Sequence, residues 1–196
     1  MIPTHQQDRD GTAVLLAALA FAAQKHRDQR RKDPEASPYI NHPIDVANIL
    51  YFTGNVRDPA VLAAAVLHDT VEDTDTTHEE LVAHFGTRIA DVVSEVTDDK
   101  SLPSKVRKQH QIDHAPHIST AAKLVKLADK ISNLSDVHTS PPASWSETRQ
   151  IAYYHWAQKV VAGLRGTNAA LEQAFDDICT TFFATRPHAR EDRHAG

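Results

Sequence analysis

The sequence predicts an all-α fold. Apolar side chains recur at helical spacing along almost the whole chain, and no stretch alternates strictly between apolar and polar residues as a β-hairpin would. The chain has 196 residues, of which 41% are hydrophobic, so it is long enough for one full core and too short for two ordinary domains. We therefore expect one domain over residues 12–184, with flexible polar ends at 1–11 and 185–196.

Local signals mark where the first helices begin and end. Thr12 precedes the first apolar run, and Gly54 is expected to close the next helix. Asp58 followed by Pro59 is the pattern of a cap and a first helical residue, and it predicts a helix over residues 60–67. Because this helix is apolar on every side, we expect it to lie in the core.

The second half of the chain predicts longer helices. Thr77 and Glu80 have the spacing of a capping box, and Gly86 is a stop signal for that helix. Thr87 and Ser119 are expected to cap two later helices. The remaining helices are expected over residues 87–96, 104–114, 119–137, 146–164 and 167–183.

Charge and composition exclude several classes of protein. The net charge of −5 argues against binding nucleic acid through charge alone, and the longest apolar run, residues 13–23, is too short to span a membrane. A single cysteine, Cys179, cannot form a disulfide within the chain, so we expect a soluble protein of the reducing cytoplasm. Two basic clusters, residues 25–32 and 100–110, are either solvated helix faces or sites for an anion.

The most informative stretch follows the apolar helix and places one imidazole and three carboxylates close together. It comprises His68, Asp69, Glu72 and Asp73. Histidine together with carboxylate oxygens suits a first-row divalent metal rather than a structural zinc ion. His68 and Asp69 would point about 100° apart on a continuous helix, so they can share an ion only where a helix end lets the backbone adjust. Further ligands must come from elsewhere in the chain.

Two other positions are candidate partners. His42 precedes Pro43 at the start of a predicted helix, where it is either a capping or core histidine or a metal ligand. Asp129 interrupts an apolar helix, where it is either a ligand or a salt-bridge partner of Lys126 or Lys130. Only the joint pattern of these residues favours a metal site.

Glu72 and Asp73 are more carboxylates than one metal needs. In a functional interpretation they orient or deprotonate a water, which requires a base within hydrogen-bond reach of the nucleophile. In the simpler interpretation they form a solvated acidic turn. The spacing alone leaves both interpretations open.

Three motifs, in order along the chain, resemble those of a known family. They are Tyr-Ile-Asn-His-Pro at residues 39–43, Ala-Ala-Val-Leu-His-Asp-Thr-Val-Glu-Asp-Thr at 64–74, and Lys-Leu-Val-Lys-Leu-Ala-Asp-Lys at 123–130. The chain is similar to phosphohydrolases of the HD superfamily, specifically the alarmone hydrolases of the RelA/SpoT hydrolase-domain family. The likeness is greatest to the stand-alone small alarmone hydrolases of the metazoan SpoT-homologue type, and it covers about residues 13–174.

The resemblance implies a fold, an activity and a metal site. The implied fold is a single HD-domain bundle of about eight to ten helices. The implied activity is hydrolysis of the 3′-pyrophosphate of (p)ppGpp to GDP or GTP and pyrophosphate, without the synthetase activity of longer relatives. The family binds one manganese ion, and its ligand positions correspond to His42, His68, Asp69 and Asp129. The positions assigned to activating the attacking water are Glu72 and Asp73.

The basic clusters have a use if the substrate carries two pyrophosphate groups, because an acidic protein must offset that charge locally. Arg31 and Lys32 are the best phosphate candidates. The resemblance also points to Asn133 near the nucleotide, and to Arg149 and Tyr153 on the other phosphate arm. The expected partner is thus a small pyrophosphorylated purine nucleotide, and neither a nucleic acid nor a membrane.

Two positions depart from the pattern of the family. Ser132 stands where relatives have a bulkier ring, and Ser135 stands where they commonly have arginine. A missing guanidinium bears on substrate preference, so (p)ppApp and the phosphate of NADPH stay open as alternative substrates. A non-catalytic nucleotide-binding or metal-binding protein is a third alternative, which the intact Glu72 and Asp73 disfavour because a sensor needs no water-activating base. The sequence leaves the oligomeric state open.

Overall fold

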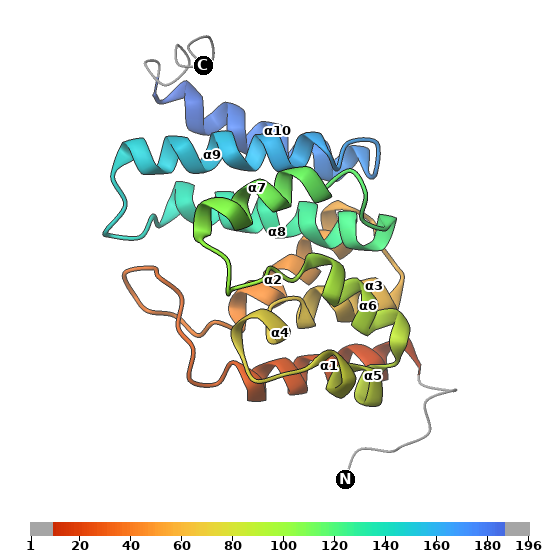
Figure 1. The fold of residues 1–196 in the computed structure, drawn as a ribbon. Coiled ribbons are helices and arrows are strands. Elements are labelled where there is room, and N and C mark those ends of the chain that lie inside the picture. Colours follow the sequence, from red (N-terminus) through yellow and green to blue (C-terminus); the bar gives the residue numbers. More distant parts are fainter. Residues whose placement is uncertain (1–9, 187–196) are drawn as a thin grey trace.

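The structure is a computed structural model that describes residues 10–186. Within this range the chain forms ten α-helices and one π-helical segment, with an isolated β-bridge between Arg30 and Pro38 and no β-strand (Figure 1). The predicted all-α class and helix number are therefore confirmed. The ends that we expect to be flexible lie for most of their length outside the described residues.

The helices form two layers, and the first surrounds a short apolar helix. This central helix, α3 (Pro59–Leu67), is buried at every position from Val61 to Leu67. It packs against α1 (Gly11–Lys25), α2 (Asn41–Asn48) and α6 (Thr87–Val96). The same layer contains η1 (Ile49–Thr53), α4 (Thr70–Asp73) and α5 (His78–Phe85). The apolar character of α3 thus places its end deep inside the molecule.

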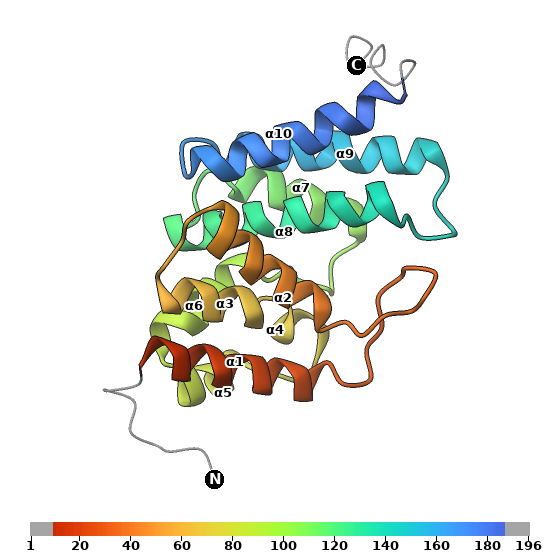
Figure 2. The ribbon, with the colours of Figure 1, turned by 180° about the vertical axis from the view of Figure 1, so that it is seen from behind.

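The second layer is built on one long helix. In it, α8 (Thr120–Thr139) lies between the first layer and the pair α9 (Glu147–Ala162) and α10 (Ala169–Ala184), as both views show (Figures 1 and 2). The remaining helix, α7 (Ser104–His114), packs against α9. The Tyr154 ring stacks on Phe182 at 3.6 Å between centroids, and the Tyr154 hydroxyl donates to the Leu134 carbonyl at 2.7 Å. These contacts hold α8 against the outer helices.

The chain leaves the helical path between α3 and α4, as the adjacent His68 and Asp69 predict. Helix α3 ends at Leu67, and Asp69, with φ −98° and ψ −2°, precedes α4 without a capping bond from its side chain. The Thr70 hydroxyl donates to the Leu67 carbonyl at 2.7 Å and so satisfies a carbonyl at the end of α3. This break turns both side chains of the His-Asp pair toward the space between the layers.

Most predicted helix starts are confirmed by their caps. The side chains of Asp58, Thr77 and Ser119 each accept a hydrogen bond from the first turn of their helix. Two predicted starts are wrong. Thr12 lies inside α1, whose cap is Asp10. Thr87 is already the first residue of α6, because Gly86 with φ 85° both closes α5 and precedes α6.

Other boundaries differ by a residue or so. The last helix starts after Asn168, whose side chain accepts from the backbone N–H groups of Ala170 and Leu171, rather than at Thr167. Among residues 10–186, no helix combines the length and the apolarity that crossing a bilayer requires. This agrees with the apolar run of residues 13–23 being too short for a membrane span.

Replacing Asn168 by alanine should lower the free energy of unfolding by about 1–2 kcal/mol. The change removes the cap of α10 and the bond from Asn168 Nδ2 to the Gly54 carbonyl, which ties α10 to the first layer. Urea denaturation followed by circular dichroism measures the loss. Gln173→Ala is the control, because Gln173 is exposed on the same helix and bonds only to Asp177 one turn away, so it should cost less than about 0.5 kcal/mol. Equal losses for the two variants would contradict the assigned cap.

Candidate metal and phosphate site

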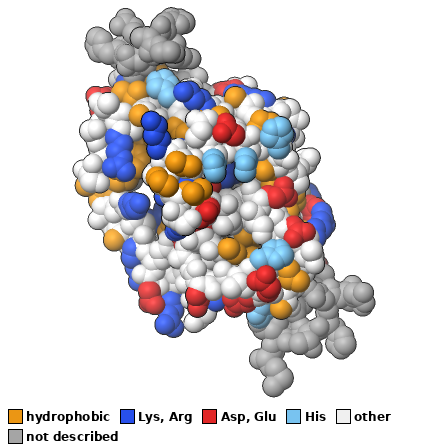
Figure 3. All heavy atoms as spheres, in the orientation of Figure 1, with side chains coloured by type: hydrophobic (Ala, Val, Ile, Leu, Met, Phe, Trp, Pro, Cys, Tyr) orange, Lys and Arg blue, Asp and Glu red, His pale blue; other side chains and the backbone are white. Residues whose placement is uncertain are grey.

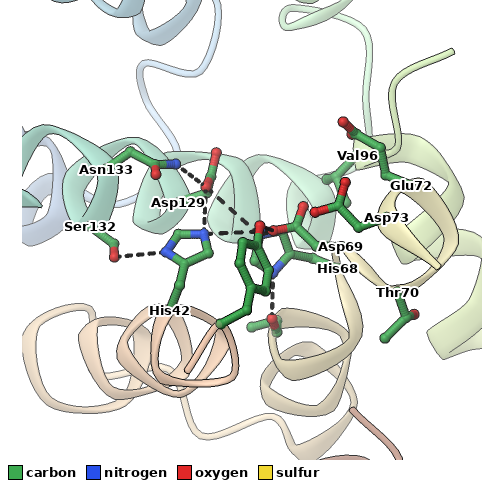
Figure 4. A network of polar contacts seen from close by, with 12 residues as sticks. His42, His68, Asp69, Thr70, Glu72, Asp73, Val96, Asp129, Ser132 and Asn133 are labelled. Atoms are coloured by element: carbon green, nitrogen blue, oxygen red, sulfur yellow. Dashed lines mark hydrogen bonds and ion pairs between the residues drawn. The ribbon is translucent and has the colours of Figure 1, made fainter. Parts of the chain in front are cut away.

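The four residues predicted as metal ligands come from three elements and meet between the two layers (Figure 4). His42 Nε2 lies 3.2 Å from Asp129 Oδ1, and His68 Nε2 lies 3.1 Å from Asp69 Oδ2. The crossed distances, from His42 to Asp69 and from His68 to Asp129, are 3.8 and 3.7 Å. The ligand atoms of His42, His68 and Asp69 all lie within 4.8 Å of one another, with both histidines buried. We call these four residues the metal cluster.

The two histidines are oriented by their outer nitrogens. His68 Nδ1 donates to the Ala65 carbonyl at 2.7 Å, and because a carbonyl can only accept, the proton must be on Nδ1. Its Nε2 is buried and close to the Asp69 and Asp129 carboxylates, yet among the described residues it makes no hydrogen bond of normal geometry. The Nδ1 atom of His42 lies 3.1 Å from the Ser132 hydroxyl. Histidines held in this way present Nε2 to a metal, so the donor set fits a divalent cation.

The charges of the cluster also suit a cation. Burial alone would raise the pKa of Asp69 and Asp129, but the neighbouring His68, together with Lys130 in the case of Asp129, holds both carboxyl pKa values below their ordinary range. The same carboxylates raise the pKa of His68 against the effect of its burial. A proton and a divalent cation therefore compete for the His68 nitrogen that faces the carboxylates.

The predicted salt bridge of Asp129 with Lys130 is present, and the other carboxylate oxygen of Asp129 faces the two histidines. Its Oδ1 atom faces the histidines, while Oδ2 accepts from Lys130 Nζ at 2.9 Å. Asn133, predicted to lie near the nucleotide, donates to Asp129 Oδ1 at 2.5 Å. Lys126, the other predicted salt-bridge partner, instead donates to the Val96 carbonyl at 3.0 Å. Asp129 is thus held in place by its own helix.

Glu72 lines the same cavity as the metal cluster, a space of about 150 Å³. Its Oε2 atom accepts from the backbone N–H of Asp98 at 3.1 Å, and its Oε1 atom lies 3.9 Å from Arg107. Burial, aided by the charges of Asp69, Asp98 and Asp73, raises the pKa of Glu72 to about 6. A carboxylate with such a pKa can accept a proton near neutral pH.

Asp73, predicted as the partner of Glu72, has different surroundings. It lines a separate cleft of about 630 Å³ rather than the cavity of the metal cluster. There it accepts from Gln29 Nε2 at 2.7 Å and pairs with Lys100. Tyr39 and Asn133 line both spaces, so the cleft reaches the metal cluster at this end.

The cleft contains most of the predicted substrate-binding residues. Arg31, Lys32, Asn133 and Tyr153 line it. Arg149 does not, because its guanidinium stacks over the ring of Trp145, which does, at 4.6 Å. Figure 3 shows most of the visible Lys and Arg side chains toward the left of the view, where the connections 26–40 and 140–146 lie in Figure 1. The cleft lining also includes Asp33, Glu35, Asp73 and Asp136, so its cationic side chains could contact an anionic ligand individually but give the lining no net positive charge.

Some residues with contacts in the site are not predicted from the sequence to have a role there. Tyr39, whose hydroxyl donates to Asp69, lies within a recognised motif but has no obvious ligand chemistry. Ser132 shows in the sequence only as a missing ring, yet its hydroxyl contacts His42. The other departure, Ser135, lines neither the cavity nor the cleft. Gln29 and Lys100 belong to polar segments whose contact with Asp73 depends on the tertiary fold.

Comparison with protein families defines the class of the protein. The model of the HD domain matches residues 18–166, a segment that contains the whole metal cluster and Glu72. A solved structure from Listeria monocytogenes EGD-e has a TM-score of 0.61 and 30% identity, covering 75% of this chain and 96% of that chain. The helical bundle with its buried His-Asp pair is thus that of an HD domain.

Individual relatives narrow the class. Guanosine-3′,5′-bis(diphosphate) 3′-pyrophosphohydrolase MESH1 of Danio rerio is 58% identical over 167 residues, which are 85% of this chain and 93% of the relative. MESH1 of Homo sapiens is 58% identical over 166 residues with the same coverage. The solved structure of a metazoan orthologue of SpoT, described as hydrolysing ppGpp, has a TM-score of 0.85 and 47% identity and covers 91% of this chain and 98% of that chain. The chain belongs to the HD-domain family, and within it to the group of the MESH1 proteins.

Replacing Asp129 by asparagine should weaken metal binding by more than about tenfold, because even residues that only orient metal ligands typically contribute about 10–100-fold. Titration of the metal-free protein with Mn²⁺ in a calorimeter measures the affinity. The control is Asp136→Asn, two turns further along α8, where the carboxylate pairs with Arg31 in the cleft and lies outside the cluster. An Asp129 variant that binds Mn²⁺ as tightly as the Asp136 variant would exclude Asp129 as a ligand.

Proposed function

We propose that the protein is a metal-dependent hydrolase that removes the 3′-pyrophosphate of (p)ppGpp, giving GDP or GTP and pyrophosphate. The observation that carries this proposal is the position of Glu72, a base with a raised pKa, in one cavity with the metal cluster. Tyr39 and Asn133 line both this cavity and the adjoining cleft, whose lining includes Arg31, Lys32 and Lys100. The proposal is supported by the relatives named as 3′-pyrophosphohydrolases and by the orthologue described as hydrolysing ppGpp.

The metal cluster would hold one divalent ion on His42, His68, Asp69 and Asp129. When bound, such an ion polarises a phosphoryl oxygen and makes a water easier to deprotonate. We propose Mn²⁺ because nitrogen and carboxylate ligands suit it and because the resemblance implies it. Ser132 and Ala65 keep the two imidazoles turned toward the ion.

The chain's own residues divide the remaining tasks. Glu72 accepts a proton from the attacking water. The Asp98 N–H and the nearby Arg107 hold the Glu72 carboxylate in position. The water oxygen bonds to the phosphorus attached to the ribose O3′, the bond from that phosphorus to O3′ breaks, and the proton passes on to O3′. Arg31 and Lys32 on the cleft wall bind the phosphates of the substrate.

The proposal includes a location and a partner. We propose a cytoplasmic location, with which the single cysteine in the sequence is consistent. The proposed partner is a small anionic nucleotide. The cleft of about 630 Å³ falls in the size range of sites for small molecules, which is about 300–1,000 Å³. We therefore assign the cleft to the nucleotide and the smaller cavity to the reacting phosphate and water.

The Mn²⁺-loaded protein should release pyrophosphate from ppGpp and pppGpp. The measurement follows pyrophosphate and phosphate separately, with ppApp and NADPH as parallel substrates. Pyrophosphate from ppApp alone would move the specificity to adenosine, and phosphate from NADPH alone would make the protein a phosphatase. Metal-loaded protein that turns over none of these substrates would leave only the non-catalytic alternative.

Hydrolysis should require deprotonated Glu72, so the rate should fall as the pH falls. With a pKa of about 6, kcat/KM at pH 5 should be about tenfold below its plateau, and the positive charge of a bound ion would shift this limb to lower pH. Glu72→Gln should keep its metal and lose about 10²–10⁴ in kcat together with the acidic limb. Metal content is measured alongside the pH profile. A Glu72→Gln variant with full activity would exclude this base.

A further inference from the structure

Three segments that are far apart in the sequence converge on Asp73. Its carboxylate belongs to α4, Gln29 comes from the connection between α1 and α2, and Lys100 comes from the connection between α6 and α7. Gln29 is itself fixed, because His26 Nδ1 donates to its Oε1 atom at 2.7 Å and leaves the Nε2 group to donate to Asp73. His26 is buried, so this chain of bonds is anchored in the core.

The partners of Asp73 distinguish it from Glu72. Glu72 lines the cavity of the metal cluster, with one backbone donor and a guanidinium nearly 4 Å away. Asp73 has both an amide and an ammonium as direct donors, and its side chain is only 15% exposed. A carboxylate whose oxygens already accept these two direct hydrogen bonds is a firm anchor for its cation.

The cation that Asp73 anchors points into the cleft. Lys100 lines it together with Arg31 and Lys32, and its side chain is 48% exposed, so a ligand can reach it. An ammonium has three protons, so Lys100 can keep its bond to Asp73 and still donate to a phosphate oxygen.

The place of Lys100 in the cleft matters for the reaction. The residues shared by the cleft and the metal cavity are Tyr39 and Asn133, and the Tyr39 N–H donates at 3.1 Å to the carbonyl of Gln29, whose side chain binds Asp73. The Lys100–Asp73 pair therefore lies at the end of the cleft nearest the metal cluster. A phosphate chain that reaches the cluster from the cleft passes this pair.

We infer that Lys100 is a phosphate-binding residue of the cleft and that Asp73 is a positioning residue that holds it there, while Glu72 alone acts as the base. The inference rests on the proposed function for its substrate. It separates two adjacent carboxylates that the family resemblance treats as one pair. It also gives a role to the second basic cluster of the sequence, of which Lys100 is the first member.

Steady-state kinetics of the Mn²⁺-loaded full chain with ppGpp test this inference. Lys100→Met should raise KM by about tenfold or more while changing kcat by less than about threefold, and Lys100→Arg should restore most of the binding. Asp73→Asn should raise KM in the same way, and the double variant should be no worse than Lys100→Met, because both changes remove one interaction. The difference between wild type and Lys100→Met should shrink as salt is added.

Lys105→Met is the matched control, because Lys105 belongs to the same basic cluster, is exposed and does not line the cleft. A KM for Lys100→Met equal to that of Lys105→Met would overturn the phosphate contact. A kcat for Asp73→Asn that falls as far as that of Glu72→Gln at unchanged KM would make Asp73 part of the base. Thermal unfolding of each variant excludes a loss of fold as the cause.

A second measurement separates this inference from the proposed function. Inorganic pyrophosphate is titrated into the Mn²⁺-loaded wild type and Lys100→Met in a calorimeter. If the wild type does not hydrolyse ppGpp, the proposed function fails, but about tenfold weaker pyrophosphate binding by Lys100→Met still supports the contact. Equal pyrophosphate affinity of the two proteins counts against it, whatever the activity of the wild type.

Discussion

The Asp129 carboxylate joins the two layers of the fold. It lies in the middle of α8, and its Oδ1 atom meets His42 at the start of α2 across the space between the layers. A buried carboxylate is costly unless it is paired and hydrogen-bonded, and here Lys130 and Asn133 supply the pairing from the same helix. The contact between α8 and α2 at this point is therefore also part of the geometry of the site.

The parts of the structure that depend on local chemistry are the parts that the sequence predicts well. The caps at Asp58 and Thr77 are side-chain to backbone bonds within one turn, so composition and spacing suffice to find them. The break after Leu67 is expected because His68 and Asp69 would point about 100° apart on a continuous helix and could not both approach one ion. His42 and Asp129 are not conspicuous singly, and they become candidates only through their joint pattern with His68 and Asp69 and through the family resemblance.

Features that depend on backbone dihedrals or on long-range packing are not predictable in this way. Gly86 adopts a positive φ between two helices, which displaces the cap expected at Thr87. The bonds from Gln29 and Lys100 to Asp73 join residues 44 and 27 positions apart, and nothing in their spacing indicates contact. The adjacency of Glu72 and Asp73 suggests a shared role, but consecutive residues of a helix point about 100° apart. The two side chains can therefore line different cavities.

The hydrogen bonds of the two histidines in the cluster fix the tautomer of one ring but not of the other. The Ala65 carbonyl can only accept, so it fixes the proton of His68 on Nδ1. The Ser132 hydroxyl can donate or accept, so it orients the ring of His42 without fixing where its proton lies. His42 Nε2 faces Asp129 Oδ1 at 3.2 Å, and a cation held there would need the lone pair of Nε2. The Ser132 hydroxyl can turn to serve either tautomer of His42, whereas the Ala65 carbonyl accepts only the Nδ1 proton of His68.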